Sequence, residues 1–330
     1  MSSVLWEGAY ELMEVITKNE ANQRLDRFMR KRFVSTPLGE IYKLIRLGKV
    51  KVNGKKVKGN YRLKEGDKIE VPELKVEEGN DLFLNVPTNI DVVYEDENIL
   101  VVNKPAGLLV HPDKNEMKRT LINQVLAYLY KEGFYDPQSA STFTPALCHR
   151  IDRNTSGLII VAKTYPALQT MTDIIRQKRL RKFYLCLVEG KLLKPHTIEY
   201  KLKKDEKKNQ VYVSPKGQKA ITRYWPIEHL NGYTLLEVEI VTGRTHQIRV
   251  HMASIGHPLV GDLKYGKKAD NQRFYKEYGL KRQFLHAHKL VLDSKDTYLE
   301  YLDGKQFISD LPLDLKKTLI ELENKEKTNV

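Results

Sequence analysis

The sequence HRIDRNTSG at residues 149–157 runs directly into LIIVA at residues 158–162, so a dense polar stretch meets a fully apolar one. The apolar run has the length and composition of a buried strand. A polar loop anchored on such a strand is held against a rigid scaffold, as catalytic loops commonly are. Asp152 is the one carboxylate in the loop. Two interpretations stay open: Asp152 acts in catalysis, or it caps a turn and pairs with Arg150 or Arg153.

Length and composition set the frame around this loop. The chain has 330 residues, is 41% hydrophobic and carries a net charge of +14, which predicts a large and a small domain and a polyanionic partner. RNA, DNA or an anionic membrane surface would each fit. No apolar run approaches the length of a bilayer span, so we expect a soluble, cytoplasmic protein. The cysteines, Cys148 and Cys186, lack the spacing of a zinc or redox motif.

The positive charge is concentrated near the N-terminus. Residues 24–71 hold fifteen Lys or Arg and five Asp or Glu, which gives ten of the fourteen excess charges. The pattern predicts a helix over 25–33, a second helix that begins at Thr36-Pro37 and ends at Gly48, a hairpin turning at Asn53-Gly54, and a strand over 68–71. This order, with the segment RLDRFMRKRF and the basic hairpin KVNGKKVKG, resembles the S4 RNA-binding domain. The alternative is that the lysines only solvate a small domain.

The remainder of the chain has the pattern of a second, larger domain. Strands are expected at 91–94, 99–103, 158–162, 183–188, 211–213, 222–225, 234–240 and 247–250, and a helix at 120–131. Many strands with few helices predict an α+β fold, with a mixed, mostly antiparallel sheet flanked by helices. We divide the chain into an N-terminal extension (1–23), the small α/β S4-like module (24–72), a linker (73–89), the large domain (90–303) and a C-terminal tail (304–330).

Three ordered blocks resemble the RluA-type pseudouridine synthase family. The blocks are HRIDRNTSGLIIVAK around Asp152, RKFYLCLVEG around Tyr184, and GRTHQIRVHMASIGHPLVGDLKYG around Arg249. Ile151 stands where leucine is usual and Asn154 where an acidic residue is common, and neither touches the implied chemistry. The resemblance implies an RNA pseudouridine synthase that modifies specific uridines, and the preceding basic module is most similar to the branch acting on 23S ribosomal RNA.

The resemblance also implies roles for individual residues. Making pseudouridine breaks the N1–C1′ bond and joins C5 to the sugar, so a nucleophile or charge stabiliser is needed near C1′ and no cofactor is expected; a carboxylate can fill this role. Asp152, Tyr184 and Arg249 are the implied catalytic residues, with Arg249 keeping Asp152 ionised and Tyr184 stacking on the uracil. Arg150 would fill the gap left by the flipped uridine, and Leu290 would form an apolar floor for the base. Phosphate contacts are expected from the hairpin lysines Lys49, Lys51, Lys55 and Lys56.

Other functions are weighed against this one. A metal site is not expected, because the close histidine pairs 246/251 and 286/288 lack a third ligand in a known arrangement. A glycosidic hydrolase usually needs paired carboxylates, and the loop offers only Asp152. A non-catalytic ribosome-associated RNA-binding protein and a transfer RNA pseudouridine synthase remain alternatives. We expect the protein to bind structured RNA as a monomer, away from membranes.

Overall fold

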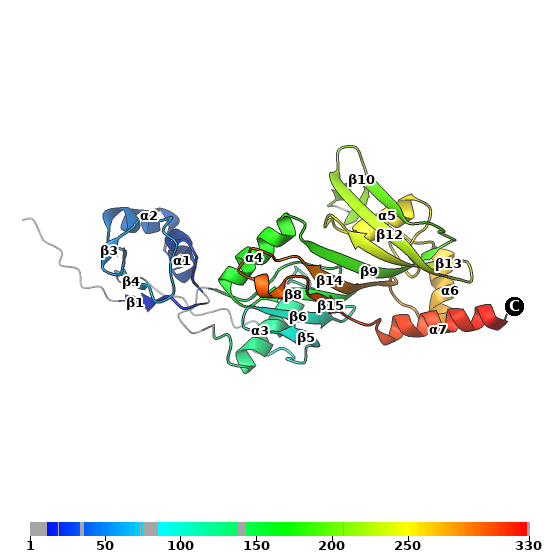
Figure 1. The fold of residues 1–330 in the computed structure, drawn as a ribbon, viewed down its shortest axis with the longest axis horizontal. Coiled ribbons are helices and arrows are strands. Elements are labelled where there is room, and N and C mark those ends of the chain that lie inside the picture. Colours follow the sequence, from blue (N-terminus) through cyan, green and yellow to red (C-terminus); the bar gives the residue numbers. More distant parts are fainter. Residues whose placement is uncertain are drawn as a thin grey trace, which may run out of the picture.

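The computed structural model describes residues 12–18, 20–33, 36–72, 74, 83, 85–137, 143–206 and 208–328. The predicted α+β class is confirmed. A small N-terminal sheet with two helices lies at the left of Figure 1, and a larger, mostly antiparallel sheet flanked by helices forms the rest. Among the described residues, no helix combines the length and the apolar composition that a membrane span requires.

The N-terminal module is a four-stranded sheet packed on two helices. Its elements are β1 (Leu12–Val15), α1 (Leu25–Arg32), α2 (Leu38–Leu47), β2 (Lys51–Val52), β3 (Lys55–Lys56) and β4 (Lys68–Val71), and the sheet order is β1-β4-β2-β3. Gly48 ends α2 in the left-handed conformation, with φ of 72°, as expected of a helix C-cap. Asn53 and Gly54 both have positive φ, which fits the predicted tight hairpin turn. The segment assigned to an N-terminal extension therefore includes β1, a strand of this sheet.

The larger sheet has eleven strands. Along the path β11-β10-β12-β13-β9-β14-β8-β6-β5 they are β11 (Gln210–Val213), β10 (His196–Asp205), β12 (Gln218–Leu230), β13 (Tyr233–Ile240), β9 (Leu180–Glu189), β14 (Leu285–Leu292), β8 (Ser156–Ala162), β6 (Ile99–Lys104) and β5 (Val92–Glu95), with β7 (Ala146–Leu147) paired to β8 and β15 (Gln306–Ile308) paired to β14. Among the described strands, β8 and β14 form the one parallel pair. Gly157 sits at that pairing, and a Cβ there would lie 2.2 Å from the carbonyl oxygen of Ala287, so only glycine fits.

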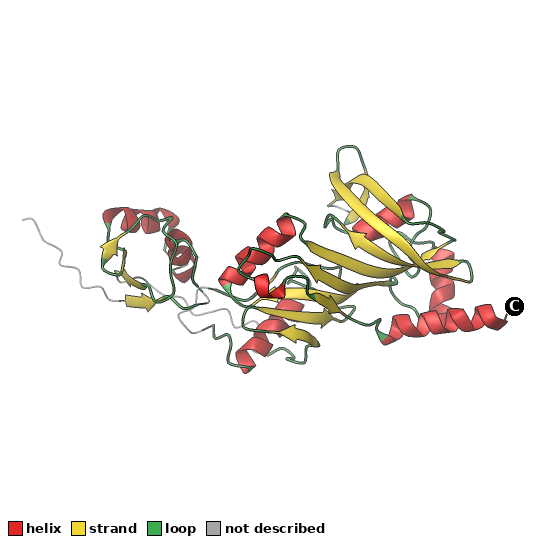
Figure 2. Ribbon diagram, in the orientation of Figure 1, coloured by secondary structure: helices red, strands yellow, loops and turns green. Residues whose placement is uncertain are grey.

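Helices cover both faces of β8 (Figure 2). Ile159 and Val161 pack in one buried cluster with α3 (Leu121–Lys131), whereas Leu158 and Ile160 pack in another with α4 (Tyr165–Arg176). Successive residues of a strand point to opposite faces, so an entirely apolar strand needs cover on both sides. The strand that follows the polar loop is therefore as rigidly held as its composition predicted.

α6 (Lys268–Tyr278) and α7 (Leu313–Thr328) pack together over the far end of the sheet, where Leu315, Leu319 and Leu322 join a cluster with Phe274. The residues assigned to a C-terminal tail thus include β15 and a helix with a buried face.

The predicted strand at 247–250 is wrong, because these residues begin α5 (Gln247–Ser254). The apolar residues Ile248, Val250 and Met252 alternate with Arg249 and His251, which imitates a half-buried strand. All of them are buried in the helix, polar and apolar alike, so the alternation does not separate an inner from an outer face.

Candidate active site

The loop that carries Asp152 is fastened to the end of β6. The Gly107 N–H donates to the carbonyl oxygen of Arg153 at 2.9 Å, and Nε of Arg153 donates back to the Gly107 carbonyl at 2.9 Å. The buried Lys104 ammonium donates to the carbonyl oxygens of Pro105, Leu108 and Arg153 at 2.8, 2.9 and 3.0 Å. Burial lowers the pKa of Lys104 to about 7. Hydrogen bonds thus link residues 104–108 to Arg153, far away in the sequence, and they fix the loop on the sheet.

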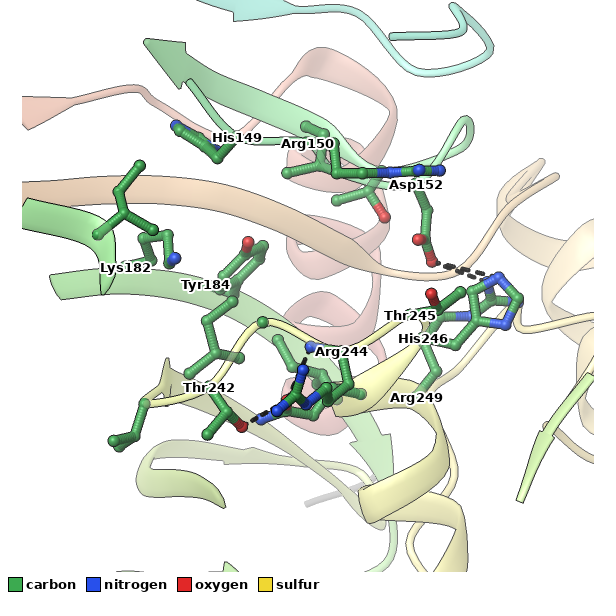
Figure 3. A pocket seen from close by; sticks show the side chains of 18 of the residues that line it. His149, Arg150, Asp152, Lys182, Tyr184, Thr242, Arg244, Thr245, His246 and Arg249 are labelled. Carbon is green, nitrogen blue, oxygen red and sulfur yellow. Dashed lines mark hydrogen bonds and ion pairs between the residues drawn. The ribbon is translucent and has the colours of Figure 1, made fainter. Parts of the chain in front are cut away.

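Arg249 joins the loop to a second carboxylate. Its Nη1 donates to Oδ2 of Asp152 at 2.9 Å, while Nε and Nη2 donate to the two carboxylate oxygens of Asp262 at 2.7 and 2.8 Å. Arg249 is 7% exposed and Asp262 is fully buried, whereas the Asp152 side chain is 25% exposed. The bidentate pair with Asp262 aims the guanidinium, and its remaining N–H group holds Asp152 at the surface of the cavity (Figure 3).

The protonation states of this network are set by opposing effects. Burial alone would lower the pKa of Arg249, but hydrogen bonds and charge from Asp262 and Asp152 raise that pKa above its usual value. Burial likewise opposes ionisation of Asp262, yet Arg249 and the backbone N–H groups of Lys264 and Tyr265 hold the pKa of Asp262 below its usual range. Arg249 is therefore a permanent cation between two carboxylates.

His246 lies on the other side of Asp152. It precedes α5 in the left-handed conformation, with φ of 53°, and its Nε2 lies 3.9 Å from Oδ2 of Asp152. Its Nδ1 is hydrogen-bonded to the hydroxyl of Tyr265 at 2.8 Å. Burial, opposed by the charge of Asp152, lowers the pKa of His246 to about 4, so the ring is neutral at physiological pH. Gln247 pins the start of α5 by hydrogen bonds to Thr242, Arg244 N–H, Ile221 and Thr222.

The side chain of Asp152 lines a cleft with a volume of about 620 Å³ (Figure 3). Of the described residues that line it, one is acidic, Asp152, and six are Lys or Arg: Arg150, Arg176, Lys178, Lys182, Arg244 and Arg249. Tyr184 from β9 forms part of the wall and is 6% exposed. Burial, and then the charge of Asp152, raise the pKa of Tyr184 well above its usual value, so its hydroxyl stays protonated. The cleft thus offers one carboxylate and one phenol ring within a strongly cationic wall.

The structure brings most of the residues singled out by sequence together. Asp152, Tyr184, Arg249 and the exposed Arg150 all line the cleft. Leu290 does not: it is 1% exposed in a separate apolar cluster, and Leu285 is the β14 residue in the cleft wall. Leu290 was chosen by its position in the sequence alone, and the bulge in β14 between residues 287 and 289 shifts the register there.

The module lysines lie on a different part of the chain from the cleft. Lys49, Lys55 and Lys56 are exposed and Lys51 is half-buried, and β2 and β3 place Lys51 opposite Lys56. The sequence did not assign a place at the site to Lys104, Lys182 or Asp262, and His246 was considered only as a metal ligand. Asp262 lies inside the third quoted block, but the local sequence does not show that Arg249 is its partner.

The histidines considered as metal ligands have other partners. Nδ1 of His251 is hydrogen-bonded to Thr222 at 2.9 Å, Nδ1 of His286 to Ser156 at 3.0 Å, and Nε2 of His288 to Glu237 at 3.0 Å. Within the described part of the chain, no three His, Cys, Asp or Glu side chains are grouped so that they could hold a metal ion.

A carboxylate held by a buried arginine, in a cationic cleft beside an aromatic ring, fits an enzyme that acts on a nucleic acid base. Comparison with known proteins agrees. Residues 98–254 match the RNA pseudouridylate synthase family, and residues 23–69 match the S4 domain. The chain is 35% identical to the ribosomal large subunit pseudouridine synthase C of Escherichia coli (strain K12) over 324 residues, which covers 94% of this chain and 96% of that protein.

Two further comparisons point the same way. An uncharacterized RNA pseudouridine synthase of Bacillus subtilis (strain 168) is 34% identical over 310 residues, covering 93% of this chain and 96% of that protein. The solved structure of human RNA pseudouridylate synthase domain containing 1 superposes with a TM-score of 0.51 and 25% identity, covering 71% of this chain and 95% of that one. The chain belongs to the RNA pseudouridylate synthase family. It is an RNA pseudouridine synthase, an isomerase with an N-terminal S4 domain.

Proposed function

We propose that this enzyme isomerises uridines of 23S ribosomal RNA, with Asp152 as the catalytic carboxylate. The assignment of Asp152 rests on its hydrogen bond from Arg249 at 2.9 Å. The other charged residues that line the cleft are basic. A carboxylate that is partly exposed and fixed by a buried cation is suited to attack or stabilise an electrophilic sugar carbon. The absence of a second acid among the cleft residues argues against a hydrolase that needs a carboxylate pair.

The reaction needs no net change in atoms or electrons. The N1–C1′ bond breaks and its electron pair leaves with the uracil, while Asp152 either forms an ester with C1′ or pairs with the sugar cation. The uracil turns, C5 attacks C1′, and any ester bond to Asp152 breaks. C5 then loses a proton and N1 gains one. Neither an oxidant nor a reductant takes part, so we propose that the enzyme works without a cofactor.

Other cleft residues position the substrate in this proposal. The uridine flips out of its stack, its base lies against the ring of Tyr184, and the exposed Arg150 fills the vacated space in the RNA. Arg249 holds the Asp152 carboxylate in position through its hydrogen bond. The hydroxyl of Tyr184 stays protonated, so it serves as a hydrogen-bond donor and not as an anion.

The substrate assignment rests on similarity and charge. The Escherichia coli relative is named for the large ribosomal subunit, and the S4 domain carries exposed lysines at Lys49, Lys55 and Lys56, with Lys51 beside them. We propose that these four lysines contact the RNA backbone and that the protein acts as a cytoplasmic monomer. We also propose that the RNA-binding unit centres on residues 24–72, with β1 added, and the catalytic unit on residues 90–303, with β15 and α7 added. Transfer RNA is the alternative substrate, and pseudouridine maps of total RNA with and without the gene distinguish the two.

Replacing Asp152 tests the chemistry directly. Asp152→Asn is expected to abolish pseudouridine formation in a 23S ribosomal RNA transcript, while RNA affinity stays within a few-fold, because the phosphate contacts are intact. Pseudouridine in the retained RNA and free uracil are both measured, and wild type is expected to release no uracil. Asp310→Asn, at an exposed carboxylate, is the matched control. Measurable turnover by pure Asp152→Asn protein would falsify the assignment.

A further inference from the structure

Lys182 occupies the part of the cleft beyond Tyr184. Both residues are on β9, two positions apart, so their side chains project from the same face of the strand. Both line the cleft, and Figure 3 shows Tyr184 between Lys182 and Asp152. Any base that lies against Tyr184 with its sugar at Asp152 therefore turns its opposite edge toward Lys182.

Among the residues that the structure describes, none pairs with the ammonium group of Lys182. Lys182 is half-buried, and within the described residues it forms neither a hydrogen bond nor an ion pair. The other described lysines between residues 90 and 303 that are buried or half-buried have hydrogen-bond or ion-pair partners. Lys104 donates to three carbonyl oxygens, Lys163 pairs with Glu95 at 2.5 Å, and Lys289 pairs with Glu237 at 2.7 Å. Lys182 is an exception to this pattern, at the wall of the active site.

The surroundings of Lys182 leave its charge uncompensated. His149 accepts a hydrogen bond from the Ile160 N–H at Nε2, and burial together with the charge of Lys182 lowers the pKa of His149 to about 3, so the ring is neutral. The one acid of the cleft, Asp152, is bound to Arg249. Burial lowers the pKa of Lys182 as well. An unpaired cation in this half-buried position destabilises the folded protein. A ligand oxygen that accepts a hydrogen bond from Lys182 would offset this cost.

We propose that Lys182 binds a carbonyl oxygen of the flipped uracil and stabilises the negative charge that the base gains when the N1–C1′ bond breaks. The electron pair of that bond passes to N1 and is delocalised onto O2 and O4. A fixed cation at one of these oxygens therefore lowers the energy of the leaving group without any proton transfer. This inference rests on the proposed role of Asp152, because Asp152 sets which edge of the base faces Lys182.

A phosphate contact is the competing role for Lys182. The exposed Arg176 and Lys178 lie at the same cleft and are free to follow a backbone, whereas Lys182 is half-buried beside the ring that receives the base. The two roles differ in what they change. A phosphate contact changes RNA affinity and its dependence on salt, and a contact to the leaving base changes the rate of the chemical step.

The test compares Lys182→Met with Lys182→Arg and with Lys194→Met, at an exposed lysine outside the cleft. Single-turnover rates and affinity are measured on a 23S ribosomal RNA transcript, with affinity followed over a salt series. Lys182→Met is expected to lower the rate by about 10²–10³-fold, with affinity and salt slope near those of wild type. Lys182→Arg, which keeps the charge, is expected to recover much of the rate. Lys194→Met is expected to match wild type.

Thermal unfolding supplies an independent readout. Because the Lys182 cation is unpaired, Lys182→Met is expected to unfold at the same temperature as wild type or higher, which a merely structural lysine would not allow. An unchanged rate, or an intact rate with weaker affinity and a smaller salt slope, overturns the proposal, as does a lowered unfolding temperature. Asp152→Asn is assayed in parallel. If it is inactive while Lys182→Met is fully active, the role of Lys182 fails and that of Asp152 stands; if it is active, the proposed function itself fails.

Discussion

The cleft and the N-terminal module both present positive charge, but they hold it differently. In the cleft, Arg249 is 7% exposed and bonded on both sides by carboxylates. On the module, Lys55 and Lys56 are exposed and project from a short hairpin. A buried cation is fixed to a fraction of an ångström and is screened little by salt, whereas exposed lysines provide a field that salt weakens. The first arrangement suits chemistry at one atom, and the second suits attraction of a polyanion.

The largest effect is expected at the buried pair. Asp262→Asn removes the charge that neutralises Arg249 and one half of its bidentate grip, so it should destabilise the protein by about 3–5 kcal/mol. Because Arg249 then no longer points firmly at Asp152, the single-turnover rate should fall about 100-fold or more. Denaturant unfolding and single-turnover assays measure the two effects.

Asp293→Asn is the matched control for Asp262→Asn. Asp293 pairs with Arg179 at 2.7 Å but is 61% exposed, so its replacement should leave both the stability and the rate close to those of wild type. If Asp262→Asn is as stable and as fast as Asp293→Asn, the contrast between fixed and exposed charge does not hold.

The sequence predicted correctly those elements whose local pattern of residues agrees with their place in the folded protein. The loop at 149–157 contrasts sharply with β8, and Asn53-Gly54 forms a turn that needs only its own backbone. The prediction failed at 247–250, where burial of polar residues by tertiary partners removed the usual meaning of alternation. Asp262 and Lys182 matter because of neighbours brought in from other strands and loops, and no local spacing encodes those contacts.

The two regions should also differ in their response to acid. The pKa of His149 is lowered to about 3, and those of His246, His251 and His286 to about 4, chiefly by burial. Residues 24–72 contain no histidine. Between these pKa values and about 6.5 in the unfolded chain, the unfolded state binds more protons, so stability is full above about pH 6.5 and is lost as pH falls.

When the pH falls from 7 to 5, each of these histidines should lower the free energy of unfolding of the large domain by about 2 kcal/mol. Thermal and denaturant unfolding at the two pH values measure the loss. His251→Gln isolates one contribution at a residue that does not line the cleft. Its stability should fall less than that of wild type over the same interval. Equal losses in both proteins would show that His251 does not contribute to the acid sensitivity.

The smallest effect is expected on the module. The double variant Lys55→Ala with Lys56→Ala should weaken RNA binding several-fold at low salt. With fewer phosphate contacts, binding releases fewer counterions from the RNA. The slope of log affinity against log salt should fall by about 0.7–0.9 for each contact removed. The single-turnover rate at saturating enzyme should stay at the wild-type value, because the cleft is untouched. Binding across a salt series on a 23S ribosomal RNA transcript measures the slope.

The control for the hairpin variant is Lys191→Ala with Lys194→Ala, which removes the same charge from two exposed lysines of the large domain. Net charge falls equally in both proteins, so a difference in slope reports position and not total charge. A module that only supports folding of the larger domain predicts equal slopes and affinities for the two double variants and wild type. A module that grips RNA predicts a lower slope for the hairpin variant alone, since only its lysines then lie along the path of the phosphate backbone.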